Sequence, residues 1–258
     1  MNLFYKTHGT GEPLILISGF ASGGWLWFRQ IADLSKHFQI VTFDPRGISH
    51  SKLDENETVT ISQIADDVVK ILDELKIEKA SILGTSFGGF VAQDFALRYP
   101  ERLNKLVLAC TSFGGKNHVL PDNFEVLTAF ISTENLNSAD RIRKFMIPAF
   151  TKDFVENNFE IVEKTCQLRE ANEVPETVYL QQLQAATTFD TEAKIPNIKA
   201  ETLIITGDSD QVVPMQNSLN LANLIPNAKL EIVENCGHLF FIEQAEKFNK
   251  LVKTFLEN

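Results

Sequence analysis

Residues 83–89, LGTSFGG, decide the fold. The stretch fits the pattern G-x-S-x-G with Ser86 at its centre, and it joins an apolar run, KASILG, to a helical pattern, FGGFVAQDFALRYP. At such a strand–turn–helix junction the backbone of the serine is strained, and its Oγ is lifted off the sheet. Gly84 and Gly88 suit this turn because Cβ atoms would clash where the helix and the strand approach each other. The motif therefore predicts Ser86 as a catalytic nucleophile.

Two other interpretations of this turn are weaker. A dinucleotide-binding loop requires G-x-G-x-x-G, and here Ser86 stands at the second glycine, where a side chain blocks the close approach of a pyrophosphate. The phosphate-loop pattern G-x-x-x-x-G-K-[ST] occurs nowhere in the sequence. A glycine-rich turn with an incidental serine remains the alternative to a nucleophile.

Short apolar runs on both sides of the motif predict the strands of a sheet. Runs that are apolar throughout are typical of strands buried on both faces, as in parallel sheets. They are PLILIS, QIVTFD, KASILG, LNKLVLAC, ETLIITG and KLEIVE, with NLFYKTH as an expected edge strand. Helical patterns alternate with them, such as TISQIADDVVKILDEL, which begins with a Thr60–Gln63 capping box, and QAEKFNKLVKTFLEN. The alternation predicts an α/β fold with a doubly wound, mostly parallel sheet.

The alternation stops between about residues 112 and 196. This stretch reads as several helices, in NFEVLTAFIS, ADRIRKFMIPAF, DFVENNFEIVEKTCQLREA and PETVYLQQLQAAT. A helical insertion of this size after a strand is best explained as a cap over one end of the sheet. We therefore expect a core formed by residues 1–111 and 197–258, and a helical cap formed by residues 112–196.

A serine hydroxyl is a poor nucleophile near neutral pH and needs a base. Of the five histidines in the chain, His238 stands out because it follows the run KLEIVE and precedes the last helical pattern. Functional loops in a sheet of this class lie beyond the C-terminal ends of the strands. His238 is therefore the predicted base, and the other four histidines are expected to be surface or core residues.

A third group must fix the tautomer of the histidine and stabilise its imidazolium form. The stretch GDSDQVVP, residues 207–214, follows the preceding strand-like run and offers two acids, Asp208 and Asp210. Residues two apart in an extended chain tend to point the same way, so the predicted sheet alone does not choose between them. A metal site is the weaker alternative for this stretch, because no third ligand of fitting spacing is visible.

These motifs together resemble the α/β-hydrolase fold family, in which serine, acid and histidine follow one another in this order. The resemblance covers nearly the whole chain, through GEPLILISGF, TFDPRGISHS, GTSFGG, RYPERLNKLVLAC, TLIITGDSDQVVP and NCGHLFFIEQ. It is strongest to small capped serine hydrolases such as 3-oxoadipate enol-lactonases, carboxylesterases and cofactor-free haloperoxidases. In these proteins the acid is the fourth residue of G-x-x-D-x-x-x-P. The resemblance therefore implies that Asp210 is the acid, whereas Asp208 is expected to cap the turn.

The resemblance also implies an oxyanion hole formed by the backbone N–H groups of Phe20 and Phe87. Three positions depart from the family's pattern. Ser18 stands before Gly19 where the family usually has histidine, Ser49 replaces an expected glycine, and EQAEKF lacks the proline often found after the glutamate that follows the histidine. None of these departures falls on the predicted triad.

Phenylalanine is unusually frequent, with 20 residues, and a cap over the predicted elbow would form an apolar cleft lined by some of them. The candidate pocket residues are Trp25, Phe113, Phe124, Phe130, Phe145 and Phe150, although simple core packing is the alternative for each. The predicted cap also carries Arg141, Arg143 and Arg169. These arginines could meet a substrate carboxylate, but a solvated helix face is expected for each.

Composition limits the class of protein further. The formal charge of −10 and a pI near 5.0 argue against nucleic acids and anionic membranes as partners, because both require clustered basic residues. Three cysteines without a CxxC spacing predict neither a disulfide framework nor a zinc site. We see no signal peptide and no transmembrane run, and we expect a cytoplasmic protein. The sequence leaves the oligomeric state open.

The sequence thus predicts a serine hydrolase that cleaves small carboxylic esters or lactones without a metal or an organic cofactor. Its expected partner is a small apolar or aromatic ester or lactone. Two alternatives use the same triad, namely hydrolysis of a C–C bond and formation of peracids. A third alternative is a ligand sensor that retains the fold but turns over slowly.

Overall fold

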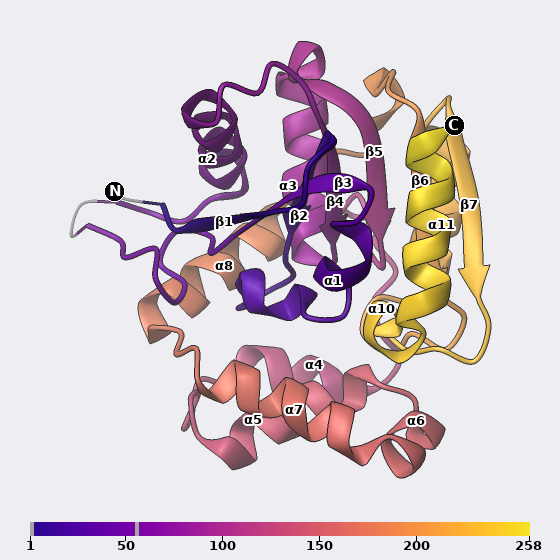
Figure 1. The fold of residues 1–258 in the computed structure, drawn as a ribbon. Helices are drawn as coiled ribbons and strands as arrows, with labels where there is room; N and C mark the ends of the chain where they lie inside the picture. Colours follow the sequence, from indigo (N-terminus) through magenta and orange to yellow (C-terminus); the bar gives the residue numbers. More distant parts are fainter. Residues whose placement is uncertain (1–2, 55–56) are drawn as a thin grey trace.

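The computed structural model describes residues 3–54 and 57–258, and a seven-stranded sheet forms its centre (Figure 1). The strands lie in the order β1-β3-β2-β4-β5-β6-β7, and all neighbours are parallel except β1, which pairs antiparallel with β3 at the edge. Their bounds are β1 Tyr5–His8, β2 Glu12–Ile17, β3 Phe38–Phe43, β4 Ala80–Thr85, β5 Leu103–Ala109, β6 Thr202–Gly207 and β7 Ala228–Val233. The predicted α/β class, the mostly parallel sheet and the edge strand are confirmed.

Helices lie on both faces of this sheet and beyond one of its ends (Figure 1). Their bounds are α1 Ile31–Leu34, α2 Ile61–Glu74, α3 Phe87–Arg98, α4 Phe124–Ile131, α5 Ala139–Met146, α6 Lys152–Asn157, α7 Phe159–Glu170, α8 Glu176–Thr188, α9 Gln216–Leu224, α10 Phe240–Glu243 and α11 Ala245–Glu257. The predicted N-terminal cap of helix α2 is present, because the Thr60 hydroxyl accepts a hydrogen bond from the Gln63 N–H at 3.2 Å.

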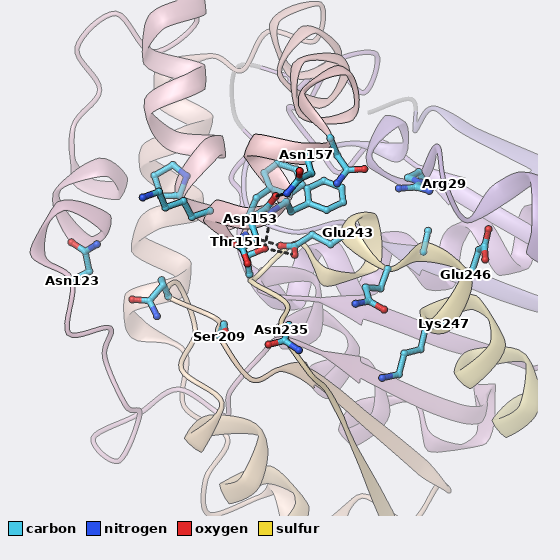
Figure 2. Close-up of a pocket in the computed structure, with 18 residues that line it drawn as sticks. Arg29, Asn123, Thr151, Asp153, Asn157, Ser209, Asn235, Glu243, Glu246 and Lys247 are labelled. Atoms are coloured by element: carbon cyan, nitrogen blue, oxygen red, sulfur yellow. Dashed lines mark hydrogen bonds between the residues drawn. The ribbon is translucent and has the colours of Figure 1, made fainter.

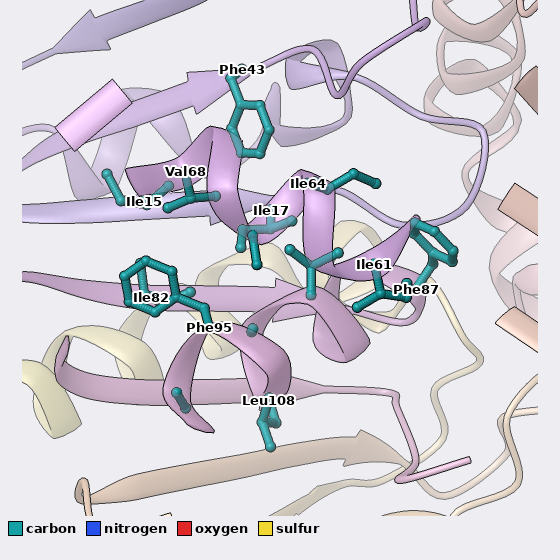
Figure 3. Packing of buried hydrophobic residues seen from close by; sticks show 14 of the residues in the cluster. Ile15, Ile17, Phe43, Ile61, Ile64, Val68, Ile82, Phe87, Phe95 and Leu108 are labelled. Atoms are coloured by element: carbon teal, nitrogen blue, oxygen red, sulfur yellow. The ribbon is translucent and has the colours of Figure 1, made fainter. Parts of the chain in front are cut away.

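Alternation along the strands divides the core into two layers. In β2, Ile15 and Ile17 face the layer that contains α2 and α3, whereas Leu14 and Leu16 face the layer that contains α1 and α11. Figure 3 shows the first layer, where side chains of α2 and α3 pack onto the sheet. Because both faces are covered, the strand runs are apolar at consecutive positions.

Helices α4 to α8 lie between β5 and β6 in the sequence. In Figure 1, α4 to α7 gather below the sheet, and α8 leads back towards it. One predicted helix is divided into α6 and α7, because Asn158 between them has a non-helical backbone with φ −135° and ψ 38°. The segment before α6 is fixed to the core, because Thr151 donates hydrogen bonds to the Glu243 carboxylate through its N–H and its hydroxyl, both at 3.0 Å (Figure 2). The boundaries of the core and the cap stay a prediction.

Across residues 3–54 and 57–258, none of the helices combines the length and the apolar character needed to cross a membrane.

Candidate active site

Ser86 occupies a strained turn between β4 and α3. Its backbone has φ 52° and ψ −120°, a conformation that residues with a Cβ rarely adopt. The two motif glycines explain how the turn fits. A Cβ on Gly84 would lie 2.2 Å from the Gly88 carbonyl oxygen, and a Cβ on Gly88 would lie 2.3 Å from the Ile17 carbonyl oxygen. The chain therefore has the tight strand–turn–helix junction that the motif predicts.

His238 and Asp210 meet as a buried pair beyond the ends of β6 and β7. Asp210 Oδ2 lies 2.8 Å from His238 Nδ1, and the two residues are only 4 % and 7 % exposed. The other carboxylate oxygen, Oδ1, accepts hydrogen bonds of 2.8 Å from the N–H groups of Val212 and Val213. These two donors fix the orientation of the carboxylate, and the carboxylate in turn orients the imidazole.

The ionisation of His238 follows from this pairing. Burial favours the neutral imidazole, but the adjacent Asp210 carboxylate outweighs it and raises the pKa of His238 well above its usual value. With Nδ1–H donating to Asp210, Nε2 is the ring atom that remains to accept a proton. Ser86 and His238 line the same small cavity of about 50 Å³, so the serine and the imidazole face a common space.

Asp208 is separated from this pair by its exposure and by its partners. Its carboxylate accepts hydrogen bonds from Ser209 Oγ at 2.9 Å and from the Cys236 N–H at 3.3 Å. Partial burial opposes ionisation, but these and other backbone hydrogen bonds prevail and lower the pKa of Asp208. The side chain thus joins the loop after β6 to the loop after β7, as expected of a residue that caps the turn.

Cys110 was not singled out by sequence reasoning, yet it lies beside the histidine–aspartate pair. Its Sγ and the side-chain ligand atoms of Asp210 and His238 all lie within 4.8 Å of one another. Burial raises the pKa of the Cys110 thiol, so the thiol is protonated at neutral pH. Asp210 already accepts three hydrogen bonds, which favours its role as the orienting group over that of a metal ligand.

The loop after β2, residues 18–23, passes directly beside Ser86. A Cβ on Gly19 would lie 3.4 Å from the Ser86 Cβ, which brings the following residue, Phe20, next to the serine. Phe87 is the first residue of α3, and the N–H groups of the first helical turn have no acceptor within their own helix. This placement is consistent with the predicted oxyanion hole.

Two side chains hold this loop in shape. Ser18, the residue that replaces the usual histidine, donates its hydroxyl to the Gly23 carbonyl oxygen at 2.7 Å and so closes the loop on itself. Ala21 has a positive φ of 52°, and its N–H donates to Gln182 Oε1 on α8 at 2.8 Å. Gln182 is only 1 % exposed. The backbone conformation next to the Phe20 N–H therefore depends on Gln182, which lies 161 positions after Ala21 in the sequence.

If the Phe20 N–H is the predicted oxyanion donor, we expect Gln182→Leu to lower kcat by about tenfold with little change in KM, because a small displacement of such a donor acts mainly on the transition state. Gln181→Leu is the matched control. Gln181 lies on the same helix and also accepts a 2.8 Å hydrogen bond from a backbone N–H, that of Val59, away from Ser86. Steady-state kinetics and thermal unfolding of both variants separate the two roles. An equal loss of kcat in both variants would contradict the role of Gln182 in positioning the loop beside Ser86.

Two cavities meet at Ser86. The small one, of about 50 Å³, also contacts His238, and the other, of about 480 Å³, is mostly apolar. Three of the six predicted pocket residues line these cavities, namely Phe124, Phe130 and Phe145.

The other three predicted pocket residues, Trp25, Phe113 and Phe150, line neither cavity. Phe113 is buried in the core layer that contains α2 and α3, and Trp25 packs against the opposite layer. Phe150 stacks on Phe154, with ring centroids 5.6 Å apart, beside a separate polar pocket of about 980 Å³ (Figure 2).

The three arginines of the helical insertion have structural partners. Arg141 and Arg169 are buried, which contradicts the expectation of a solvated helix face, and both donate to backbone carbonyl oxygens within the insertion. Arg143 pairs with Glu163. None of the three lines the cavities at Ser86. His118, which was expected to be a surface or core histidine, does line the larger cavity, where burial lowers its pKa.

Glu243 braces the loop that carries His238. Its Oε1 accepts a hydrogen bond of 3.0 Å from the Thr151 N–H (Figure 2) and another of 3.0 Å from the Gly237 N–H, so one buried carboxylate joins the histidine loop to the segment before α6. On the other side of the histidine, the Leu239 N–H donates to the Ala149 carbonyl oxygen at 2.9 Å. His238 is therefore held on both sides by the helical insertion.

Known proteins are similar to this chain in fold and in sequence. The profile of the α/β-hydrolase fold matches residues 12–160 and 168–245. A protein of Caulobacter vibrioides with the provisional name carbamate hydrolase RutD is 30% identical over 99% of this chain and 95% of its own length. A 2-hydroxymuconate semialdehyde hydrolase of Pseudomonas sp. CF600 is 30% identical over 96% of this chain and 88% of its own. The structure of an enol-lactonase from Burkholderia xenovorans superposes with a TM-score of 0.84 at 26% identity, covering 99% of this chain and 96% of that one.

The chain belongs to the α/β-hydrolase fold family. Its relatives, which differ in substrate but are named as hydrolases or as a lactonase, identify it as a hydrolase.

Proposed function

We propose that this protein is a serine hydrolase of carboxylic esters or lactones, with Ser86 as nucleophile, His238 as base and Asp210 as the acid that orients it. One observation carries the proposal. A strained serine and a buried histidine that is paired with an aspartate at 2.8 Å line the same cavity. Neither a core histidine nor an incidental serine requires this arrangement.

The reaction follows the usual two steps of acyl transfer. His238 Nε2 takes the Ser86 proton as Oγ attacks the carbonyl carbon, and then passes this proton to the departing oxygen. An acyl-enzyme remains on Ser86. His238 next takes a proton from a water molecule, the hydroxide attacks the acyl carbon, and the protonated histidine returns the proton to Ser86 as the acid leaves.

The negative charge on the carbonyl oxygen is proposed to be stabilised by the N–H groups of Phe20 and Phe87. Each such donor is worth about 3 kcal/mol of the activation barrier in sites of this kind. The dipole of α3, whose N-terminus is at Phe87, acts in the same direction. We also propose that helices α4 to α8 form the cap and that the substrate is small and apolar or aromatic, because the 480 Å³ cavity is lined mainly by apolar side chains of the core and the insertion.

Hydrolysis of a C–C bond is the second candidate. It is favoured by the 30% identity to a 2-hydroxymuconate semialdehyde hydrolase, since the same triad serves both reactions. Peracid formation would also use this triad. A ligand sensor with slow turnover is the candidate outside enzymes, and the complete Ser86, Asp210 and His238 set argues against it.

A fluorophosphonate probe combined with a substrate panel tests the proposal. We expect stoichiometric labelling of Ser86, located by peptide mass mapping, and steady turnover of acyl esters or lactones. Turnover of vinylogous diketones without ester hydrolysis would favour the C–C hydrolase. A single stoichiometric burst followed by silence in pre-steady-state kinetics would favour the sensor, and absence of labelling would contradict a serine nucleophile.

A further inference from the structure

The two cavities at Ser86 differ in size and in their relation to the base. Phe20, Phe130 and Val212 line both cavities, as Ser86 does, so these side chains form the boundary between them. His238 lines only the cavity of about 50 Å³. The site is therefore divided into a small side next to the histidine and a large side away from it.

The proposed chemistry assigns the two parts of an ester to these sides. The imidazolium must donate its proton to the departing oxygen, so the alcohol part of the ester has to lie on the side of His238. The acyl part then extends from the carbonyl carbon in the opposite direction. The small cavity thus becomes the alcohol subsite, and the large cavity becomes the acyl subsite.

The alcohol subsite is small, and buried side chains form its walls. Leu26, Met146 and Phe241 are 3 %, 4 % and 1 % exposed, and they come from three separate elements. Its volume of about 50 Å³ is roughly a tenth of that of the acyl subsite, and it exceeds the ~10–15 Å³ that a cavity needs to hold one water molecule. Among the described residues that line it, only His238 is ionisable. It therefore offers no lysine or arginine to a carboxylate, and after the alcohol leaves it has room for the hydrolytic water.

The acyl subsite is larger, and part of its lining is exposed to solvent. Its lining includes Phe90, Leu127 and Leu183, and the cavity of about 480 Å³ extends to Leu120, Phe124 and Ile131, which are 60 %, 75 % and 67 % exposed. An apolar opening of this kind lets a long bound acyl chain extend beyond the cavity without a steric limit.

We infer that the enzyme hydrolyses esters with a large apolar or aromatic acyl part and an alcohol part of one or two carbons, with one water consumed and the acid and the short alcohol released. The inference rests on the proposed function and adds the substrate class. It also disfavours C–C hydrolysis with a bulky leaving group, because such a group requires volume on the side of His238.

Isomeric esters provide the test, because each pair has the same atoms and differs only in orientation. Methyl phenylacetate is compared with benzyl acetate, and methyl hexanoate with pentyl acetate, by proton release with a pH indicator. We expect kcat/KM to favour each methyl ester by at least about 100-fold, the discrimination that an apolar pocket achieves against several additional carbons. Equal rates or a preference for the acetates would overturn the inference.

Cavity variants locate the effect. Met146→Ala and Leu26→Ala enlarge the alcohol subsite from two different elements, and we expect each to raise kcat/KM for benzyl acetate relative to methyl phenylacetate by about tenfold. Met215→Ala is the matched control, because Met215 lines neither cavity. Leu183→Trp, on the acyl side, should lower the rate with methyl hexanoate relative to methyl acetate.

The result also separates the two levels of the proposal. Fluorophosphonate labelling of Ser86 together with a reversed preference within the isomer pairs would refute the substrate class and leave the serine hydrolase standing. Absence of both labelling and ester turnover would refute the proposed function and the inference with it. If one cavity variant does not fold, the other carries the same test.

Discussion

Ser86→Ala is expected to lower kcat for ester hydrolysis by about 10⁵-fold or more, because removal of the nucleophile from a serine triad abolishes the acyl-enzyme route. The residual activity comes from the oxyanion donors and from binding alone. Labelling by a fluorophosphonate should be lost in the same variant. Burst kinetics with a chromogenic ester measure both the chemical step and the number of active sites.

The controls for Ser86→Ala use the geometry of the turn. Ser81→Ala removes a serine at the other end of the same strand, β4, and should retain nearly full activity. Ser86→Gly relieves the positive φ of 52° and should be more stable than Ser86→Ala by about 1 kcal/mol, although equally inactive. A Ser86→Ala enzyme with wild-type turnover would show that another residue is the nucleophile.

The sheet and its helices were predictable because local and tertiary signals agree. In α2, the predicted apolar positions Ile61, Ile64 and Val68 form the face that packs against the sheet (Figure 3). A break that depends on a single residue was not predictable. The backbone at Asn158 ends α6 and precedes α7, yet the apolar pattern continues through it.

The candidate site was predictable where a motif encodes the geometry. Gly84 and Gly88 are required by contacts below 2.5 Å that a Cβ would make, so the motif itself specifies the turn at Ser86. The contact of Gln182 with the loop at Ala21 is not encoded by any sequence motif. A buried glutamine on a helix has no characteristic spacing, and its partner is distant in the sequence.

Only three of the six predicted pocket residues line the cavities at Ser86, because amino-acid type does not determine which way a helix faces. Phe145 and Phe150 are five residues apart, but α5 ends between them at Met146 and the chain turns. As a result Phe145 lines the cavity at Ser86, whereas Phe150 packs on Phe154. The burial of Arg141 has a similar origin, since its partners are the carbonyl oxygens of Ala129 and Ser132 near the end of α4.

Asp210→Asn and Asp208→Asn are expected to differ by orders of magnitude in kcat. Asp210 Oδ1 accepts from the N–H groups of Val212 and Val213, so an asparagine at this position must direct its oxygen to them and its NH₂ group to His238. The imidazole then accepts at Nδ1 and carries its proton on Nε2, the tautomer that cannot take the proton of Ser86. A wrong tautomer of this kind lowers kcat by about 10⁴-fold.

Asp208→Asn keeps an oxygen that can accept from Cys236 and Ser209, so it should cost about 1 kcal/mol of stability or less and leave kcat nearly unchanged.

The pH dependence of kcat/KM provides a second test of which aspartate orients His238. Asp210 raises the pKa of His238, and only neutral imidazole acts as the base, so the acidic limb of kcat/KM in the wild type should lie above pH 6.5, the usual pKa of histidine. Loss of the carboxylate in Asp210→Asn should move this limb to lower pH, whereas Asp208→Asn should not move it. The reverse pattern would make Asp208 the orienting acid, against the 2.8 Å contact between Asp210 and His238.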